Sequence, residues 1–327
     1  MADQRLCLFA LHATAAFGAA VAAALGLPLA AHEEREFEDE EHKARPLDTV
    51  RGADVFVLQS LHSGPEQSAN DKLCRLLFFI GALKDAGAAR VTALTPYLCY
   101  ARKDRRTKPN DPVTTRYVAN LFEAVGTDAV VTLDVHNPAA FENAFRRPTV
   151  ALTAAPLFVD YAKGLVDEKL CVISPDTGGA KRADLVHEAL EAALGRPVGK
   201  GFADKRRSSG VVSGELFVGE VEGATALVID DLISTGGTLV RAARAARRAG
   251  AKRVLALVTH GLFMPGAEAA LIDPAIDRIV VTDSVPAFRL GAGAARAKVD
   301  IVSVAPLFAE CIRRLRAGET LTDLLVF

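Results

Sequence analysis

Short apolar runs alternate with helical patterns along this chain, and this alternation limits the possible fold more than any other sequence feature. The runs lie at residues 54–58, 90–94, 129–133, 170–173, 225–229, 253–258 and 278–281. Helical patterns lie between them, at residues 71–86, 112–125, 183–193 and 237–249. Strands and helices that alternate in this way favour parallel sheets with helices on both faces. We therefore predict an α/β protein.

The chain is long enough for two domains. Its 327 residues exceed the usual size of one domain, and half of them are hydrophobic, which is enough for two cores. The alternating pattern lapses around residues 145–150, where Arg146, Arg147 and Pro148 interrupt it, and then begins again. We place the predicted domain boundary there, which gives domains of residues 1–149 and 150–327.

Charge and cysteine content exclude several classes of function. The formal net charge is −1, so neither nucleic acid nor an anionic membrane is expected as the main partner. The five cysteines are odd in number and far apart, which is typical of reduced core residues and not of a disulfide frame or zinc site. The alanine-rich start lacks a basic leading region, and no stretch reaches transmembrane length. We expect a cytoplasmic location.

The strongest candidate site follows a buried run in the second half of the chain. Residues 226–238 read Ala-Leu-Val-Ile-Asp-Asp-Leu-Ile-Ser-Thr-Gly-Gly-Thr. Glycines allow a main chain to approach a phosphate, and a helix that begins there presents backbone N–H groups to it. The two acids are placed to accept hydrogen bonds from ribose hydroxyls. The predicted sugar-phosphate site consists of Asp230, Asp231, Ser234, Thr235, Gly236, Gly237 and Thr238; the alternative is an ordinary capped turn between a strand and a helix.

Two further segments have an ordinary interpretation beside a functional one. Residues 33–43 are mostly charged and would normally form a solvated face, but Phe37 is the lone aromatic residue there, and in a strand it would share one side with Asp39 and Glu41. Residues 204–210, Asp-Lys-Arg-Arg-Ser-Ser-Gly, are predicted to form a mobile surface loop. A mobile cationic loop is also suited to neutralising phosphoryl oxygens after substrates have entered.

The run at residues 226–238 resembles the signature of the families that bind phosphoribosyl pyrophosphate, which include the phosphoribosyltransferases and the ribose-phosphate pyrophosphokinases. Four more segments resemble the pyrophosphokinases in order and spacing. They are Pro-Tyr-Leu-Cys-Tyr-Ala-Arg-Lys-Asp at 96–104, Thr-Leu-Asp-Val-His at 132–136, Ser-Pro-Asp-Thr-Gly-Gly-Ala-Lys-Arg at 174–182, and Thr-His-Gly at 259–261. The resemblance spans nearly the whole chain.

The resemblance implies a fold of two phosphoribosyltransferase-type domains, each a mainly parallel sheet flanked by helices, with a C-terminal helix at about 304–318 completing the first. It implies that a hairpin at residues 33–43 stacks Phe37 on adenine and that the nucleotide is bound by Phe37, Asp39, Glu41, Arg102, Lys103 and Asp104. It places a metal at His136 and Asp176, although an imidazole is an unusual ligand for magnesium. Lys205 and Arg207 correspond to a catalytic Lys-x-Arg pair. Lys103 stands where the family usually has glutamine, and Ser234 stands where it often has aspartate.

The implied activity is that of a ribose-phosphate diphosphokinase, which uses Mg²⁺, ATP and ribose 5-phosphate to make phosphoribosyl pyrophosphate and AMP for nucleotide biosynthesis. The implied assembly is a homo-oligomer, either a dimer or a hexamer built from dimers. Two alternatives stay open. One is a noncatalytic regulatory subunit that resembles the synthetases. The other is a phosphoribosyltransferase, which would share the Asp230 segment but use phosphoribosyl pyrophosphate together with a base.

Overall fold

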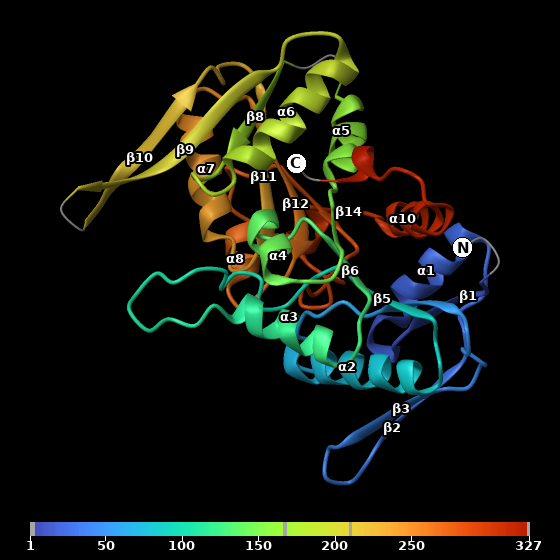
Figure 1. Cartoon of the computed structure of the whole chain (residues 1–327). Helices are drawn as coiled ribbons and strands as arrows, with labels where there is room; N and C mark the ends of the chain where they lie inside the picture. The colour runs from blue at the N-terminus through green and yellow to red at the C-terminus, as the bar shows by residue number, and fades with distance from the viewer. Residues whose placement is uncertain (1–3, 166–168, 209–210, 326–327) are drawn as a thin grey trace. The chain divides into compact units, whose positions relative to one another are not determined.

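The computed structural model of the protein describes residues 4–165, 169–208 and 211–325. The chain divides into two compact units, each with its own main sheet and helices (Figure 1). Unit 1 is Met1–Thr153 together with Val304–Phe327, and unit 2 is Ala154–Ser303. Within the described residues, no helix has both the length and the apolar character needed to cross a membrane.

A parallel sheet forms the centre of unit 1. Its strands, in order across the sheet, are β1 (Leu6–Ala10), β4 (Asp54–Leu58), β5 (Arg90–Thr95), β6 (Ala129–Leu133) and β7 (Thr149–Leu152). β4 and β6 are buried along their whole length, as strands covered on both faces should be. The strands predicted at 54–58, 90–94 and 129–133 are confirmed, and β1 and β7 extend the sheet at its two edges.

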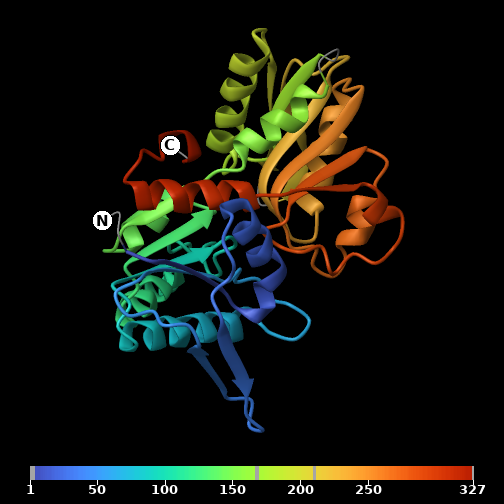
Figure 2. The same cartoon turned by 90° about the vertical axis from the view of Figure 1, so that its right-hand side faces the viewer.

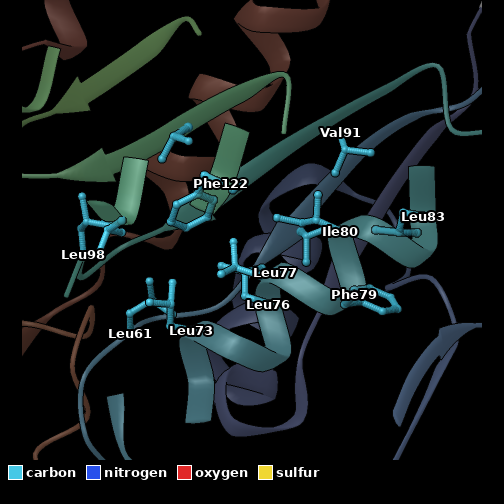
Figure 3. Packing of buried hydrophobic residues seen from close by; sticks show 14 of the residues in the cluster. Leu61, Leu73, Leu76, Leu77, Phe79, Ile80, Leu83, Val91, Leu98 and Phe122 are labelled. Carbon is cyan, nitrogen blue, oxygen red and sulfur yellow. The ribbon is translucent and has the colours of Figure 1, made fainter. Parts of the chain in front are cut away.

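Helices cover both faces of this sheet, and Figure 2 shows α2 and α10 on opposite faces. The helical elements of unit 1 are η1 (His12–Thr14), α1 (Ala15–Leu25), α2 (Ala69–Asp85), α3 (Thr114–Ala124), α4 (Pro138–Ala144), α10 (Ala305–Ala317) and η2 (Thr322–Leu324). Phe79 of α2 and Phe122 of α3 share a fully buried cluster with Phe9 of β1, part of which is drawn in Figure 3. On the other face, Phe17 and Phe308 join α1 to α10 edge to face, with ring centroids 5.7 Å apart.

A hairpin extends from unit 1, and Figures 1 and 2 both show it projecting away from the main sheet. It consists of β2 (His32–Glu36) and β3 (His42–Pro46), which pair antiparallel. Its strands are mostly polar, so the apolar runs that reveal buried strands are missing here. An ion pair of 2.7 Å between Glu36 and Arg75 connects the hairpin to α2.

Unit 2 has a larger sheet, in which β10 is antiparallel to its neighbour β9 and the other pairs are parallel. The strands, in order across the sheet, are β10 (Val211–Gly219), β9 (Gly199–Ser208), β8 (Leu170–Ser174), β11 (Thr225–Ile233), β12 (Arg253–Gly261), β13 (Arg278–Thr282) and β14 (Val299–Val302). The strands predicted at 170–173, 225–229, 253–258 and 278–281 are confirmed, although β11 and β12 continue beyond the predicted ends.

The helices of unit 2 also pack on its sheet. They are α5 (Ala155–Lys163), α6 (Ala180–Leu194), α7 (Gly237–Arg248), α8 (Ala267–Leu271) and α9 (Ala294–Ala297). The small side chains of Ala242, Ala243 and Ala246 let α7 lie close to β11 and β12, and all three are buried. Because the strands are parallel, the segments that follow β8 and β11 emerge at the same edge of the sheet. The candidate site of unit 2 lies at that edge.

Candidate active site

Asp230 and Asp231 lie inside β11, at the carboxyl end of the sheet of unit 2. We predicted that the strand ends at Ile229, with both acids after it. That boundary is wrong, because β11 continues to pair with β12 as far as Ile233. Its pairing with β8 stops at Val228. Both acids therefore lie on a part of β11 that is still paired with β12 on one side but no longer with β8 on the other.

The surroundings of Asp230 disfavour its charged form. Burial, and next the negative charge of Asp231, raise the pKa of Asp230 to about 8. The backbone N–H of Asp231 donates a 2.9 Å hydrogen bond to Asp230 Oδ1, which fixes the orientation of that carboxyl group. A ligand that brings hydroxyl donors or positive charge would relieve this repulsion. A strongly shifted pKa of this kind is typical of a functional site.

Arg182 supplies a positive charge to the same acid pair. This residue lies in the first turn of α6, and its Nη2 is 4.0 Å from Asp231 Oδ2. Both side chains are largely buried, so solvent screens the pair weakly. Our sequence analysis quoted Arg182 within a motif but assigned it no role. Only the fold shows that α6 brings it to β11.

The predicted phosphate loop, residues 234–238, connects β11 to α7 as expected. Gly236 has a φ of +79°, and a Cβ at this position would lie 2.7 Å from the Cβ of Ala270, so only glycine fits. α7 begins at Gly237 and has no side-chain hydrogen bond at its N-cap. The first-turn N–H groups of such a helix attract anions. Arg241 donates a 2.9 Å hydrogen bond to Thr238 Oγ1, which places a further cation at this turn.

Asp176 lies in the loop between β8 and α6, at the same sheet edge. Its Oδ1 accepts hydrogen bonds from the backbone N–H groups of Gly178, at 2.9 Å, and Gly179, at 3.1 Å. The hydroxyl of Ser174 donates to the backbone carbonyl of Asp176 at 2.7 Å. These bonds hold a half-buried carboxylate in one orientation.

Lys205 and Arg207 lie on β9 and not in a loop. We predicted a loop over residues 204–210, and for residues 204–208 this is wrong, since β9 runs to Ser208 and pairs with β10. Residues 209 and 210, and the side chains of 204–216, lie outside the described part of the structure. β9 runs parallel to β8, and its residue Phe202 is level with Ser174, the last residue of β8. Lys205 and Arg207 therefore lie on the part of β9 that extends past this edge of the sheet.

In unit 1, the segment after β5 carries three of the residues predicted to bind ATP, of which Arg102 is predicted to contact the phosphates. Arg102 is exposed. Lys103 forms a 2.6 Å ion pair with Asp111 in the same segment. Asp104 accepts a 2.6 Å hydrogen bond from the side-chain amide of Asn137. Arg102 therefore presents its charge to solvent, whereas Lys103 and Asp104 are held by neighbours.

His136 is exposed and follows β6. The next residue along the chain is Asn137, which is hydrogen-bonded to Asp104. Asn137 caps α4 by accepting a 3.2 Å hydrogen bond from the N–H of Ala140, while its amide nitrogen donates to Asp104. Our sequence analysis gave Asn137 no role, because both of its contacts depend on how α4 folds back beside the segment after β5. His136 belongs to unit 1 and Asp176 to unit 2.

The hairpin carries the predicted adenosine contacts at its tip. Phe37 is 37% exposed, and the guanidinium of Arg35 lies 5.1 Å from the centre of its ring. We predicted that Asp39 and Glu41 continue the strand of Phe37, which is wrong, because residues 37–41 form the turn and the N–H of Glu41 donates to Asp39 Oδ1. Within the described residues, no hydrogen bond, ion pair or ring contact joins Phe37, Asp39 or Glu41 to residues 102–104.

Comparison with known proteins gives one consistent result. Residues 6–126 match the N-terminal domain of ribose phosphate pyrophosphokinase, and residues 213–326 match the phosphoribosyl synthetase-associated domain. The chain is 36% identical over 325 residues to ribose-phosphate pyrophosphokinase 2 of Enterococcus faecalis, a match that covers 98% of this chain and 96% of that one. It is 37% identical over 307 residues to the ribose-phosphate pyrophosphokinase of Aquifex aeolicus, with 93% and 94% covered.

A solved structure agrees with these matches. The crystal structure of phosphoribosylpyrophosphate synthetase from Mycobacterium smegmatis superposes with a TM-score of 0.84 at 32% identity, covering 96% of this chain and all of that one. The predicted fold class is therefore confirmed. The chain belongs to the ribose-phosphate pyrophosphokinase family.

Proposed function

We propose that this protein transfers the pyrophosphoryl group of ATP to the 1-hydroxyl of ribose 5-phosphate. The hydroxyl oxygen attacks the β-phosphorus, and the bond from that phosphorus to the oxygen it shares with the α-phosphate breaks. The hydroxyl loses its proton, AMP leaves and phosphoribosyl pyrophosphate forms. Such a transfer is catalysed mainly by positioning and charge neutralisation. Family membership supports this reaction. The structural observation that supports it most is the acid pair of β11 beside the N-terminus of α7.

In this proposal, unit 2 binds the sugar phosphate. The carboxyl groups of Asp230 and Asp231 accept hydrogen bonds from ribose hydroxyls, and the repulsion between the two acids favours a ligand that supplies such donors. The 5-phosphate binds residues 234–238, where the first-turn N–H groups of α7 and the nearby guanidinium of Arg241 provide positive potential. The guanidinium of Arg182, 4.0 Å from Asp231 Oδ2, supplies a positive charge beside this acid pair.

Unit 1 binds the nucleotide in this proposal. Arg102 contacts the phosphates. Lys103 also contacts them once phosphate oxygens take the place of Asp111 as its ion-pair partner. Asp104 and Asn137 position this segment beside His136. Phe37 stacks on adenine, and Asp39 and Glu41 accept hydrogen bonds from the adenosine. Lys205 and Arg207 neutralise charge on the transferring group.

The residues present suit a magnesium ion that arrives with ATP. Mg²⁺ keeps several waters and commonly binds proteins through only one or two carboxylates, together with substrate phosphates. Asp176 fits this role, because within the described residues no hydrogen bond reaches its Oδ2. His136 would add an imidazole ligand. When bound, the metal neutralises phosphate oxygens of ATP.

The reaction itself is tested by AMP release from ATP and Mg²⁺, measured with and without ribose 5-phosphate. We expect AMP formation that depends on the sugar, with one pyrophosphorylated sugar per AMP, identified by phosphorus NMR. If AMP appeared only with another phosphosugar, that sugar would be the acceptor in place of ribose 5-phosphate. Absence of AMP with every phosphosugar would contradict the proposed activity and favour a noncatalytic subunit, and consumption of phosphoribosyl pyrophosphate with a base would indicate a phosphoribosyltransferase.

The role of the basic pair on β9 is tested by combining Lys205→Ala with Arg207→Ala. Because these charges are proposed to act on the transition state, turnover should fall by about a hundredfold or more, while ATP affinity measured by calorimetry changes little. The matched control combines Arg147→Ala with Lys252→Ala, which removes two exposed positive charges elsewhere. Equal turnover in the two double variants would remove Lys205 and Arg207 from the mechanism.

A homo-oligomer in which Phe37 serves a neighbouring subunit is tested by complementation. The ring of Phe37 is exposed, and within the described residues no hydrogen bond, ion pair or ring contact joins it to residues 102–104, which supports a role in another subunit. Phe37→Ala and the Lys205/Arg207 double variant should each be inactive alone. Co-expressed and purified through two different tags, they should regain activity in mixed oligomers.

The control for Phe37 is Phe288→Ala, since Phe288 is 40% exposed and also lies beneath an arginine, at 4.4 Å from Arg289. This variant should keep its activity without a partner. Mixed oligomers as inactive as their parents, or a fully active monomer, would show that the hairpin does not act across subunits.

The raised pKa of Asp230 makes stability depend on pH. The unfolded carboxyl has its ordinary pKa of about 4 and the folded one about 8, so the folded state holds an extra proton between these values. The free energy of unfolding should therefore fall as pH rises from 4 to 8. Asp230→Asn should remove this loss and stabilise the ligand-free protein at pH 9 by a few kcal/mol, measured by urea unfolding.

Asp273→Asn is the contrasting control for Asp230→Asn. Partial burial raises the pKa of Asp273, but the N–H of Ala275 and the guanidinium of Arg244 outweigh it, so the pKa lies below its ordinary value. Its stabilising contribution is therefore present above pH 4, and Asp273→Asn should destabilise the protein at neutral and alkaline pH. If Asp230→Asn also destabilised the protein at pH 9, its carboxyl group would not carry the proposed strain.

A further inference from the structure

Three metal-binding side chains converge at the base of the hairpin, apart from every residue used above. They are His12 of η1 and His32 and Glu34 of β2, and one ligand atom of each lies within 4.8 Å of the other two. His32 Nε2 is 2.9 Å from Glu34 Oε1, and His12 Nδ1 is 3.7 Å from the same oxygen. His32 and Glu34 are two residues apart on one strand and therefore share a face.

The burial of this cluster is uneven, in a way that suits an ion. The side chain of Glu34 is 5% exposed and that of His32 is 9% exposed, whereas that of His12 is 62% exposed. The buried side is rigid, because the imidazole of His32 lies near the aromatic rings of Phe9, at 6.2 Å, and Phe79, at 5.4 Å. The exposed side gives a solvated ion a route of entry.

The charge of Glu34 has no lysine or arginine partner among the described residues. The backbone N–H of His12 donates a 2.6 Å hydrogen bond to Glu34 Oε1, and His32 Nε2 lies 2.9 Å from the same oxygen. Each imidazole can offer one nitrogen lone pair to a metal ion. A buried carboxylate is costly unless a cation pairs with it, and a metal ion held by all three side chains would supply that charge.

The types of ligand atom in this cluster decide which class of cation it would bind. Two imidazoles and one carboxylate are a common ligand set for zinc, with an exchangeable water in the fourth position. Zinc bonds of about 2.0–2.1 Å place tetrahedral ligand atoms about 3.3 Å apart, which lies between the two separations seen here. Mg²⁺ prefers oxygen ligands, so a set in which two of three ligands are imidazoles favours zinc over magnesium.

We propose that His12, His32 and Glu34 form a binding site for one zinc-class divalent transition metal at the base of the β2–β3 hairpin. The ion joins the segment before α1 to the strand that leads to Phe37. It would thereby restrict the motion of the hairpin relative to the sheet of unit 1.

The test is a titration of the metal-stripped full chain with Zn²⁺, followed by calorimetry in excess Mg²⁺ and without ATP. Co²⁺ is the spectroscopic probe, because its visible absorption reports four-coordinate binding. All variants carry Cys74→Ser, since Cys74 is exposed and thiolates bind zinc. We expect one Zn²⁺ per chain and an affinity at least tenfold lower in His12→Asn and in Glu34→Gln.

His12→Asn is the decisive variant, because its exposed side chain can be changed without disturbing the core. The matched control is His187→Asn, since His187 Nε2 is also 3.7 Å from a carboxylate, that of Glu191, but has no second imidazole. The control should bind zinc as the parent does. No binding by the parent, or equal binding by His12→Asn and the parent, would overturn the proposal and leave the cluster as a hydrogen-bonded structural contact.

Discussion

The burial of two adjacent carboxylates on β11 is the constraint on which the site of unit 2 depends. Burial disfavours the charged form of a carboxyl group, a second negative charge beside it adds to the cost, and both raise the pKa of Asp230. The arrangement persists because β11 stays paired with β12 through Ile233, so the backbone cannot move the acids apart. Arg182 offsets part of the charge from the first turn of α6. The sheet thus keeps the two carboxyl groups close together, and a ligand that supplies hydrogen-bond donors would reduce the repulsion between them.

The same topological rule organises both units. In a parallel sheet, the segments that follow the strands emerge at one edge, so residues distant in sequence become neighbours. In unit 2 this gathers the loop of Asp176, the acids of β11 and the start of α7. In unit 1 it gathers the segment after β5 and the segment after β6, which the hydrogen bond between Asp104 and Asn137 joins directly. The fold therefore brings together side chains from loops and from the ends of strands.

The sequence predicted those features of the structure that depend on residues close together along the chain. Fully buried strands such as β4 and β6 are continuous apolar runs, so they could be predicted. The turn from β11 into α7 could also be predicted, because its residues are contiguous in the sequence, although β11 ends later than expected. The polar strands of the hairpin have no such signal, and β9 was mistaken for a loop because its basic residues lack an apolar alternation. Arg182 and Asn137 were missed for a different reason. Their partners come from other elements, and no spacing within one segment reveals a contact that only tertiary packing creates.

The departure at Lys103 has a physical interpretation in this structure. Its ammonium group is paired with Asp111, which also accepts hydrogen bonds from the backbone N–H groups of Thr107 and Lys108. These bonds, with that of Lys103 first among them, lower the pKa of Asp111 and keep it charged. A partly exposed ion pair of this kind contributes little to stability, so a triphosphate with several negative charges can displace Asp111 from Lys103. Asp111 keeps its backbone partners when that happens. If the nucleotide binds as proposed, the segment can therefore release a cation to it and still retain its own turn, which a glutamine at position 103, carrying no charge, would not provide.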